Sequence, residues 1–302
     1  MKYKVWGTLF ITCMLAACGG SSEQVATIPV QNTPPAETPL EIPNVVQNTL
    51  ENQIIPQQAI NDMAIGINLG NTLDAPLEGE WAPAAQEYYI EAFKDAGFEH
   101  VRIPITWDNH IEESAPYQIE NAFLDRVEQI VTWALDRDLY VIINVHHDDW
   151  IKANFSDQKA RNRFDSIWIQ VSERFKHHSA KLIFEILNEP QDLSIADINT
   201  LNQRALTIIR NQTSNRLVIF SGTEWSNIEQ LSLINTPDKS DNFLIGNFHS
   251  YDPWAFAGEC KVQWGTDEDK ANLGAIYQKA SNWSTENNIP VMVNEFGVAK
   301  YD

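Results

Sequence analysis

Short apolar runs alternate with longer amphipathic segments from about residue 60 onward. The apolar runs predict strands at Ala64–Leu69, His100–Ile105, Tyr140–Val145, Leu182–Leu187, Leu217–Ser221, Phe243–Phe248 and Pro290–Val293. The amphipathic segments predict helices at Ala84–Ala96, Ala122–Asp136, Gln158–His177, Ile195–Asn211 and Ala271–Asn287. The connection after Leu217–Ser221 shows neither pattern clearly.

Continuous apolar strands separated by helices indicate a parallel sheet that is covered on both faces. Gly66–Gly70, at the first strand, forms no GxGxxG motif and starts no helix, which favours a (β/α) barrel over a nucleotide-binding fold. A (β/α)8 TIM barrel needs one strand more than this pattern predicts before Asp302. We therefore expect a chain that is truncated at its C-terminus and lacks the eighth strand and the final helix, unless one strand escapes detection.

The first 55 residues predict a targeting segment followed by a flexible tether. Residues 1–17 carry two lysines before an apolar stretch, as a signal peptide does, and small residues precede Cys18 as in a bacterial lipobox. Residues 18–55 are rich in Pro, Thr and Gln and predict a tether, so the folded domain is expected at 56–302. We expect an exported lipoprotein, anchored to a lipid bilayer through acylated Cys18, in the outer membrane or at the cell surface. The alternative is an ordinary signal peptide with a chance cysteine.

Composition narrows the classes of function. The chain has 41 Asp and Glu against 21 Lys and Arg, a formal charge of −20, which argues against a nucleic-acid binder. Three cysteines are too few for a disulfide framework. Ten tryptophans are many for this length and suit either sugar stacking or core packing. We expect a monomer that needs no cofactor.

Two carboxylates stand at corresponding strand ends. Glu189 and Glu295 each follow an Asn at the end of an apolar strand. In a barrel, functional side chains project from the C-terminal ends of the strands, so the two can face each other. A facing pair of carboxyl groups is what cleavage of a glycosidic bond requires. The alternative is that each Glu is a surface residue paired with Lys or Arg.

A metal site is a second interpretation of the polar strand ends. His146 and His147 are followed by Asp148 and Asp149, and imidazole and carboxylate groups ligate zinc. Adjacent residues of a strand point to opposite faces, however, so we expect that His146 and His147 do not share one ion. The sequence therefore predicts no metal.

Six motifs in order resemble glycoside hydrolase family 5. They are Gly66–Pro76, Val101–Pro104, Asn144–His147, Glu185–Pro190, His249–Tyr251 and Asn294–Gly297. The likeness is to the endo-β-1,4-glucanase branch, including bacterial members that also cut mannan, and it covers about residues 60 to 302. The resemblance implies a TIM barrel with a retaining mechanism.

The resemblance also implies roles for single residues. Glu189 is implied as the acid/base and Glu295 as the nucleophile, with Arg102 holding Glu295 ionised. A retaining mechanism requires the two carboxyl groups to lie about 5–5.5 Å apart.

Supporting roles follow in the same way. Asn188 is implied to bind the sugar 2-hydroxyl, Tyr251 to orient Glu295, and His249 to lie near Glu189. The further implied or expected substrate contacts are His146, His147, Asn71, Asp74, Trp225 and Trp254.

Three hypotheses for the function remain open on this sequence. The first is an endo-acting β-1,4-glucanase that cleaves cellulose or mixed-linkage β-glucan. The second, within the same family, is a β-mannanase or another β-glycanase. The third is a non-catalytic glycan-binding surface lipoprotein, which would bind polysaccharide without releasing reducing ends.

Overall fold

The computed structural model describes residues 37–43, 45 and 47–298, and all seven predicted strands lie among them. The strands are β1 Gly66–Asn68, β2 His100–Ile103, β3 Tyr140–Asn144, β4 Leu182–Glu185, β5 Val218–Ser221, β6 Leu244–Ser250 and β7 Val291–Phe296. They form one sheet in the order β1 to β7, and every neighbouring pair is parallel. The strands form a nearly closed barrel, so the predicted barrel architecture is confirmed.

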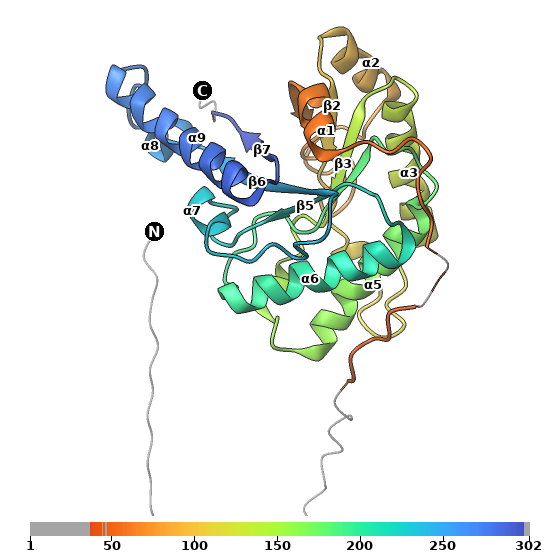
Figure 1. Ribbon diagram of the computed structural model, residues 1–302. Helices are drawn as coiled ribbons and strands as arrows, with labels where there is room; N and C mark the ends of the chain where they lie inside the picture. Colours follow the sequence, from red (N-terminus) through yellow and green to blue (C-terminus); the bar gives the residue numbers. More distant parts are fainter. Residues whose placement is uncertain (1–36, 44, 46, 299–302) are drawn as a thin grey trace, which may run out of the picture. The chain divides into compact units, whose positions relative to one another are not determined.

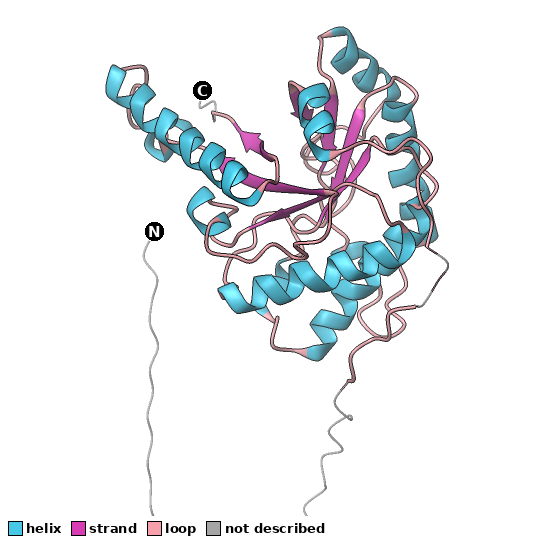
Figure 2. Ribbon diagram, in the orientation of Figure 1, coloured by secondary structure: helices cyan, strands magenta, loops and turns pink. Residues whose placement is uncertain are grey.

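Helix α1 precedes β1, and helices α2 to α9 lie between consecutive strands along the chain and pack around the sheet (Figures 1 and 2). They are α1 Pro56–Met63, α2 Glu87–Asp95, α3 Asn121–Leu135, α4 Asp149–Ala153, α5 Gln158–Phe175, α6 Ile195–Gln212, α7 Ile228–Leu231, α8 Trp254–Ala257 and α9 Asp267–Asn287, with a 3₁₀ turn at Asp108–His110. All five helices expected from the periodicity are present. The unclear connection after β5 contains α7, a single turn that is too short to show a helical period.

Short polar residues fix where the long helices begin. Asp157 caps α5 by accepting a hydrogen bond from the backbone of Lys159, and Ser194 caps α6 in the same manner. Thr266 and Asp269 form a reciprocal capping box at the start of α9. Such caps satisfy backbone N–H groups that have no partner inside the helix.

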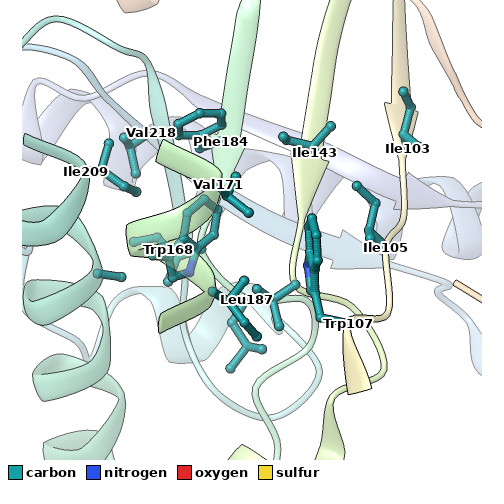
Figure 3. Close-up of a cluster of buried hydrophobic side chains, with 14 of the residues drawn as sticks. Ile103, Ile105, Trp107, Ile143, Trp168, Val171, Phe184, Leu187, Ile209 and Val218 are labelled. Carbon is teal, nitrogen blue, oxygen red and sulfur yellow. The ribbon is translucent and has the colours of Figure 1, made fainter. Parts of the chain in front are cut away.

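The strands bury apolar side chains on both faces. Toward the barrel interior, Ile142, Ile183 and Ile219 cluster with Met63 of α1. Toward the helices, the strands and α5 and α6 share a second cluster, and Figure 3 shows part of it, with Ile143, Phe184 and Val218 near Trp168, Val171 and Ile209. Burial on both faces explains why the strands read as continuous apolar runs rather than alternating ones.

Within the described part of the chain, a hydrogen bond joins β1 and β7, the two edge strands of the sheet. The Asn68 side-chain amide of β1 donates a hydrogen bond to the Asn294 carbonyl of β7 at 3.1 Å. This contact brings the ends of β1 and β7 together, so the strand ends that carry the predicted site residues lie around one rim.

The N-terminal predictions fall partly outside the described residues. The signal peptide at 1–17 and Cys18 lie outside them, as do residues 19–36 of the predicted tether. The described part from Glu37 is hydrogen-bonded to the barrel, because the side chains of Asn162 and Asn215 bind the backbone of Leu40 and Leu50. These long-range partners leave no periodic signal in the sequence. Within the described residues, no helix has both the length and the apolar character needed to cross a membrane.

Candidate active site

The carboxyl ends of β4 to β7 open into a cleft of about 1180 Å³. Its lining residues include Glu189, Glu224, Trp225, His249, Tyr251, Trp254 and Glu295. Pockets for small molecules usually measure about 300–1,000 Å³. This cleft therefore has room for an extended ligand.

A bulge in β7 at Asn294 sets which side chains face each other across this pair of strands. The pairing of β6 with β7 shifts register between Phe248 and His249, so that His249 lies opposite Glu295. A bulge lets a strand redirect a side chain without ending the ladder. The ring of His249 thereby reaches both carboxylates, at 3.0 Å from Glu189 and 3.7 Å from Glu295.

Arg102 on β2 is the buried cation of the site. Its Nε and Nη2 donate to the two oxygens of Glu185 at 2.6 and 2.9 Å, and its Nη1 donates to Glu295 at 2.7 Å. Asn68 and Asn188 accept two further hydrogen bonds from it. Burial lowers the pKa of Arg102, but the two carboxylates outweigh it and hold the pKa above its ordinary value. The guanidinium is therefore charged at any pH at which the protein folds.

Glu295 is held on several sides. Besides Arg102, it accepts a hydrogen bond from the Tyr251 hydroxyl at 3.1 Å. Burial raises the pKa of the Glu295 carboxyl, but the charges of Arg102 and His249 and the hydrogen bonds from Arg102 and Tyr251 outweigh it, so the pKa lies below its ordinary value. Glu295 is thus a partly buried carboxylate that stays ionised at neutral pH.

Glu189 is the more open carboxylate. Its side chain is 26% exposed against 13% for Glu295, and its hydrogen-bond partner is Nδ1 of His249. Its backbone has φ 43°, a left-handed conformation that is uncommon for a residue other than glycine. One oxygen of Glu189 lies within 4.8 Å of one oxygen of Glu295. An approach of this kind between single oxygens favours the separation of about 5–5.5 Å between the carboxyl groups of retaining glycosidases over the 6.5–9.5 Å of inverting ones.

The side chain of Asn188 is oriented by Arg102. Its carbonyl oxygen accepts from Nη2 of Arg102 at 2.7 Å, while its backbone N–H bonds the carbonyl of Val145 at 2.8 Å. With the oxygen engaged, the amide nitrogen is the group that remains to donate to a ligand.

His146 and His147 correct one expectation from the sequence. β3 ends at Asn144, so both histidines lie beyond the strand, and their ring centroids are 4.3 Å apart. One ligand atom from each, together with one of Asp74, lies within 4.8 Å of the others. The expectation that His146 and His147 face opposite ways is wrong, because the alternation of side chains ends with β3 at Asn144. The absence of a metal remains a prediction.

The tautomer of His146 follows from its neighbour Asn144. The Asn144 oxygen accepts from the backbone of Ile105 at 3.1 Å, so its amide nitrogen faces Glu185 and Nδ1 of His146, each at 3.2 Å. An amide nitrogen can only donate, so Nδ1 must accept and Nε2 must carry the proton. Burial, with the charge of Arg102, holds the pKa of His146 well below its ordinary value. His146 is therefore a neutral ring with an Nε2–H donor, which disfavours metal binding through Nε2.

Asp74 and Asn71 lie on the loop after β1. The Asp74 carboxylate accepts from the backbone N–H groups of Asn71 and Thr72 at 3.0 and 2.8 Å. Asp74 is buried, and Asn71 is exposed with φ 60°. Asp74 thus orders the loop that presents Asn71, and a direct sugar contact by either residue stays a prediction.

Trp225 and Trp254 both line the cleft, 56% and 60% exposed. Exposed aromatic faces of this kind suit stacking against sugar rings. The turn that carries Trp225 is unusual, since Glu224, Trp225 and Ser226 all have φ between 53° and 58°. Such strained backbone often occurs at ligand sites.

Two side chains near the site were missed in the sequence. Glu185 ends β4 and binds Arg102; the signal was a lone ionisable residue inside an apolar strand. Trp81 is half exposed, with its ring centroid 5.8 Å from that of His147. Trp81 lies on the long loop between β1 and α2, too far from the end of a strand to be recognised as a site residue by its position.

Comparison with known proteins agrees with this geometry. Residues 64–302 match the family described as Cellulase (glycosyl hydrolase family 5). Endoglucanase H of Acetivibrio thermocellus is 43% identical over 283 residues, which cover 93% of this chain and 30% of that protein. Endoglucanase B of Clostridium cellulovorans is 32% identical over 281 residues, which cover 84% of this chain and 64% of that protein. The chain thus spans less than two thirds of the length of either relative.

Solved structures share the fold. Thermotoga maritima Cel5A in complex with mannotriose superposes with a TM-score of 0.78 at 32% identity, covering 81% of this chain and 82% of that chain. The same enzyme in complex with cellobiose gives a TM-score of 0.77 at 33% identity, with coverage of 81% and 82%. The family match over most of the chain, the sequence relatives and these structures show that the chain belongs to glycosyl hydrolase family 5, the cellulase family.

Proposed function

We propose that the chain carries the catalytic centre of a retaining, endo-acting β-1,4-glucanase. The observation that supports this most is that one oxygen of Glu189 lies within 4.8 Å of one oxygen of Glu295, and that Glu295, unlike Glu189, is bonded to the charged Arg102. One carboxyl group is thereby kept ionised for attack while the other lies open to the cleft. That division of roles is what a double displacement needs.

The proposed reaction has two steps. In the first, a Glu295 oxygen attacks the anomeric carbon, the bond from that carbon to the leaving oxygen breaks, and Glu189 gives its proton to the leaving oxygen. In the second, Glu189 takes a proton from water, whose oxygen attacks the anomeric carbon and displaces Glu295. Two inversions restore the starting configuration.

Neighbouring side chains assist these steps. Tyr251 and Arg102 hold the Glu295 carboxylate in line, and His249 contacts Glu189. The free amide nitrogen of Asn188 is proposed to donate to the sugar 2-hydroxyl, a hydrogen bond that strengthens in the transition state.

The proposed substrate is a neutral β-1,4-linked glucan. Relatives described as endoglucanases support glucan, while the mannotriose complex of Thermotoga maritima Cel5A keeps β-mannan as the second candidate. Glucose and mannose differ at the 2-hydroxyl, so the choice depends on groups near Asn188 and His146.

An assay of reducing ends tests the proposal. The purified chain is expected to release reducing ends from carboxymethylcellulose or barley β-glucan, because both carboxyl groups are in place, and Glu295→Gln is expected to release none. Viscosity is expected to fall before much sugar is released, since internal bonds are cut. Release from mannan alone would favour the mannanase. Retention on a glucan affinity gel without release from any substrate would favour the glycan-binding lipoprotein.

We also propose that the chain is exported as a lipoprotein. The support is the sequence before Cys18, where an apolar stretch ends in small residues. In cells fed labelled palmitate, the chain is expected to take up label and Cys18→Ser is expected to take up none. Equal label in both would contradict acylation at Cys18.

A further inference from the structure

Glu185 is a buried carboxylate for which the proposed mechanism has no use. It is the last residue of β4, and the rest of that strand is apolar. A charge in such a place is costly unless it is paired and fully hydrogen-bonded. Glu185 therefore either serves stability alone or acts on a neighbour.

Glu185 is hydrogen-bonded to two side chains, Arg102 and Asn144, which in turn contact other residues of the site. Its two oxygens take a fork of hydrogen bonds from Arg102, whose third nitrogen binds Glu295. Its Oε2 also accepts from Asn144, whose amide nitrogen faces Nδ1 of His146. A continuous set of contacts thus runs from Glu295 through Glu185 to His146.

A purely stabilising ion pair has a different setting in this chain. Asp165 on α5 is also buried and pairs with Arg204 on α6 at 2.5 Å. Arg204 also donates a hydrogen bond to the backbone carbonyl of Leu40 at 2.8 Å. Arg102, in contrast, is shared between two carboxylates, one of which lines the cleft.

We propose that Glu185 is a positioning residue of the catalytic centre: it divides the charge of Arg102 with Glu295 and, through Asn144, fixes the ring of His146 in the tautomer that carries its proton on Nε2. This inference rests on the proposed function, because it assigns Glu185 a part in the same reaction. Glu185 would act through Arg102 and Asn144, without contact to the substrate or to the reacting atoms.

The division of charge has a predictable sign. The ionisable groups around Glu295 are Arg102 from β2, Glu185 from β4, Glu189 after β4, His249 from β6 and Tyr251 after β6. Removing the negative charge of Glu185 leaves Arg102 to Glu295 alone, and Asn68 and Asn188 still hold the guanidinium in place. The pKa of Glu295 then falls further, so its ionised form persists to lower pH.

The test compares pH profiles of Glu185→Gln and the wild-type chain on barley β-glucan. The acidic limb of kcat/KM reports the free nucleophile and is expected to move down by about one pH unit. At neutral pH kcat is expected to fall about tenfold, because a less basic carboxylate is a weaker nucleophile. Asp165→Asn is the matched control: it also removes a buried carboxylate beside an arginine, and its acidic limb should match the wild type. Melting temperatures of both variants measure the cost in stability.

Two results would overturn the charge division. One is an acidic limb that stays in place in folded Glu185→Gln, which leaves Glu185 with a stabilising role only. The other is a limb that moves to higher pH, which means that Glu295 has lost Arg102 altogether. A wild-type chain that releases no reducing ends and takes no covalent label from an activated 2-fluoro-cellobioside instead refutes the proposed function.

A second measurement needs no variant. In ¹⁵N NMR of the histidine rings, His146 is expected to show an unprotonated Nδ1 and a protonated Nε2 at neutral pH. This tautomer requires the Asn144 amide nitrogen to face Glu185. A protonated Nδ1 would overturn the link from Glu185 to His146, even if Glu185→Gln does not fold.

Discussion

Glu295→Gln is expected to lower the rate of glucan hydrolysis by about 10⁴-fold or more, because the amide cannot form the glycosyl-enzyme bond. The fall should appear in kcat, since the amide occupies nearly the same space and the cleft still binds glycan. Reducing-end release at several substrate concentrations measures both constants. In the wild-type chain, an activated 2-fluoro-cellobioside should leave its label on the peptide that contains Glu295.

The control for this variant is Glu286→Gln. Glu286 lies near the end of α9 and is exposed, so the same chemical change there should leave kcat and KM unaltered. A folded Glu295→Gln chain that keeps more than about a hundredth of the wild-type rate would contradict the nucleophile role, since acid–base assistance alone is worth about 10²–10⁴-fold.

The barrel could be predicted because its strands are buried on both faces. Each strand is a short apolar run, and the helices between them show a clear period, so the order of elements follows from pattern alone. The ends of the strands could be predicted less accurately than their order. β6 reaches Ser250 and β7 reaches Phe296, beyond the predicted ends at Phe248 and Val293. Beyond the bulge, His249 pairs with Glu295 and Ser250 pairs with Phe296, so both strands continue through polar residues. The hydrophobic pattern of the sequence does not show this backbone pairing.

The sequence predicts those residues of the site that follow directly after a strand, but not the contacts that depend on tertiary packing. Glu189 and Glu295 were expected to face each other, and the structure brings their oxygens within 4.8 Å. The approach of His146 to His147 was missed, because the alternation of side chains stops where β3 stops. Glu185 was missed because one guanidinium holds two carboxylates, and which carboxylates share an arginine depends on tertiary packing.

Glu189→Gln is expected to separate the two steps of the reaction. On β-glucan the rate should fall by about 10²–10⁴-fold, because the leaving sugar oxygen then departs without a proton. A cellobioside of dinitrophenol should react almost normally in the first step, since dinitrophenolate leaves unprotonated. Its second step should be slow, because no base activates water. Stopped-flow absorbance is expected to show a burst of dinitrophenolate followed by slow turnover.

Rescue by azide tests the role of Glu189 as the general base of the second step. Azide is already an anion, so it attacks the glycosyl-enzyme without a general base, and it should speed turnover of Glu189→Gln and yield a β-cellobiosyl azide. The same addition should leave Glu295→Gln inactive, because no glycosyl-enzyme forms. An α-azide from Glu189→Gln would mean a single displacement, which contradicts the covalent intermediate. Absence of rescue together with loss of the burst would show that Glu189 acts before bond cleavage in some way other than proton donation.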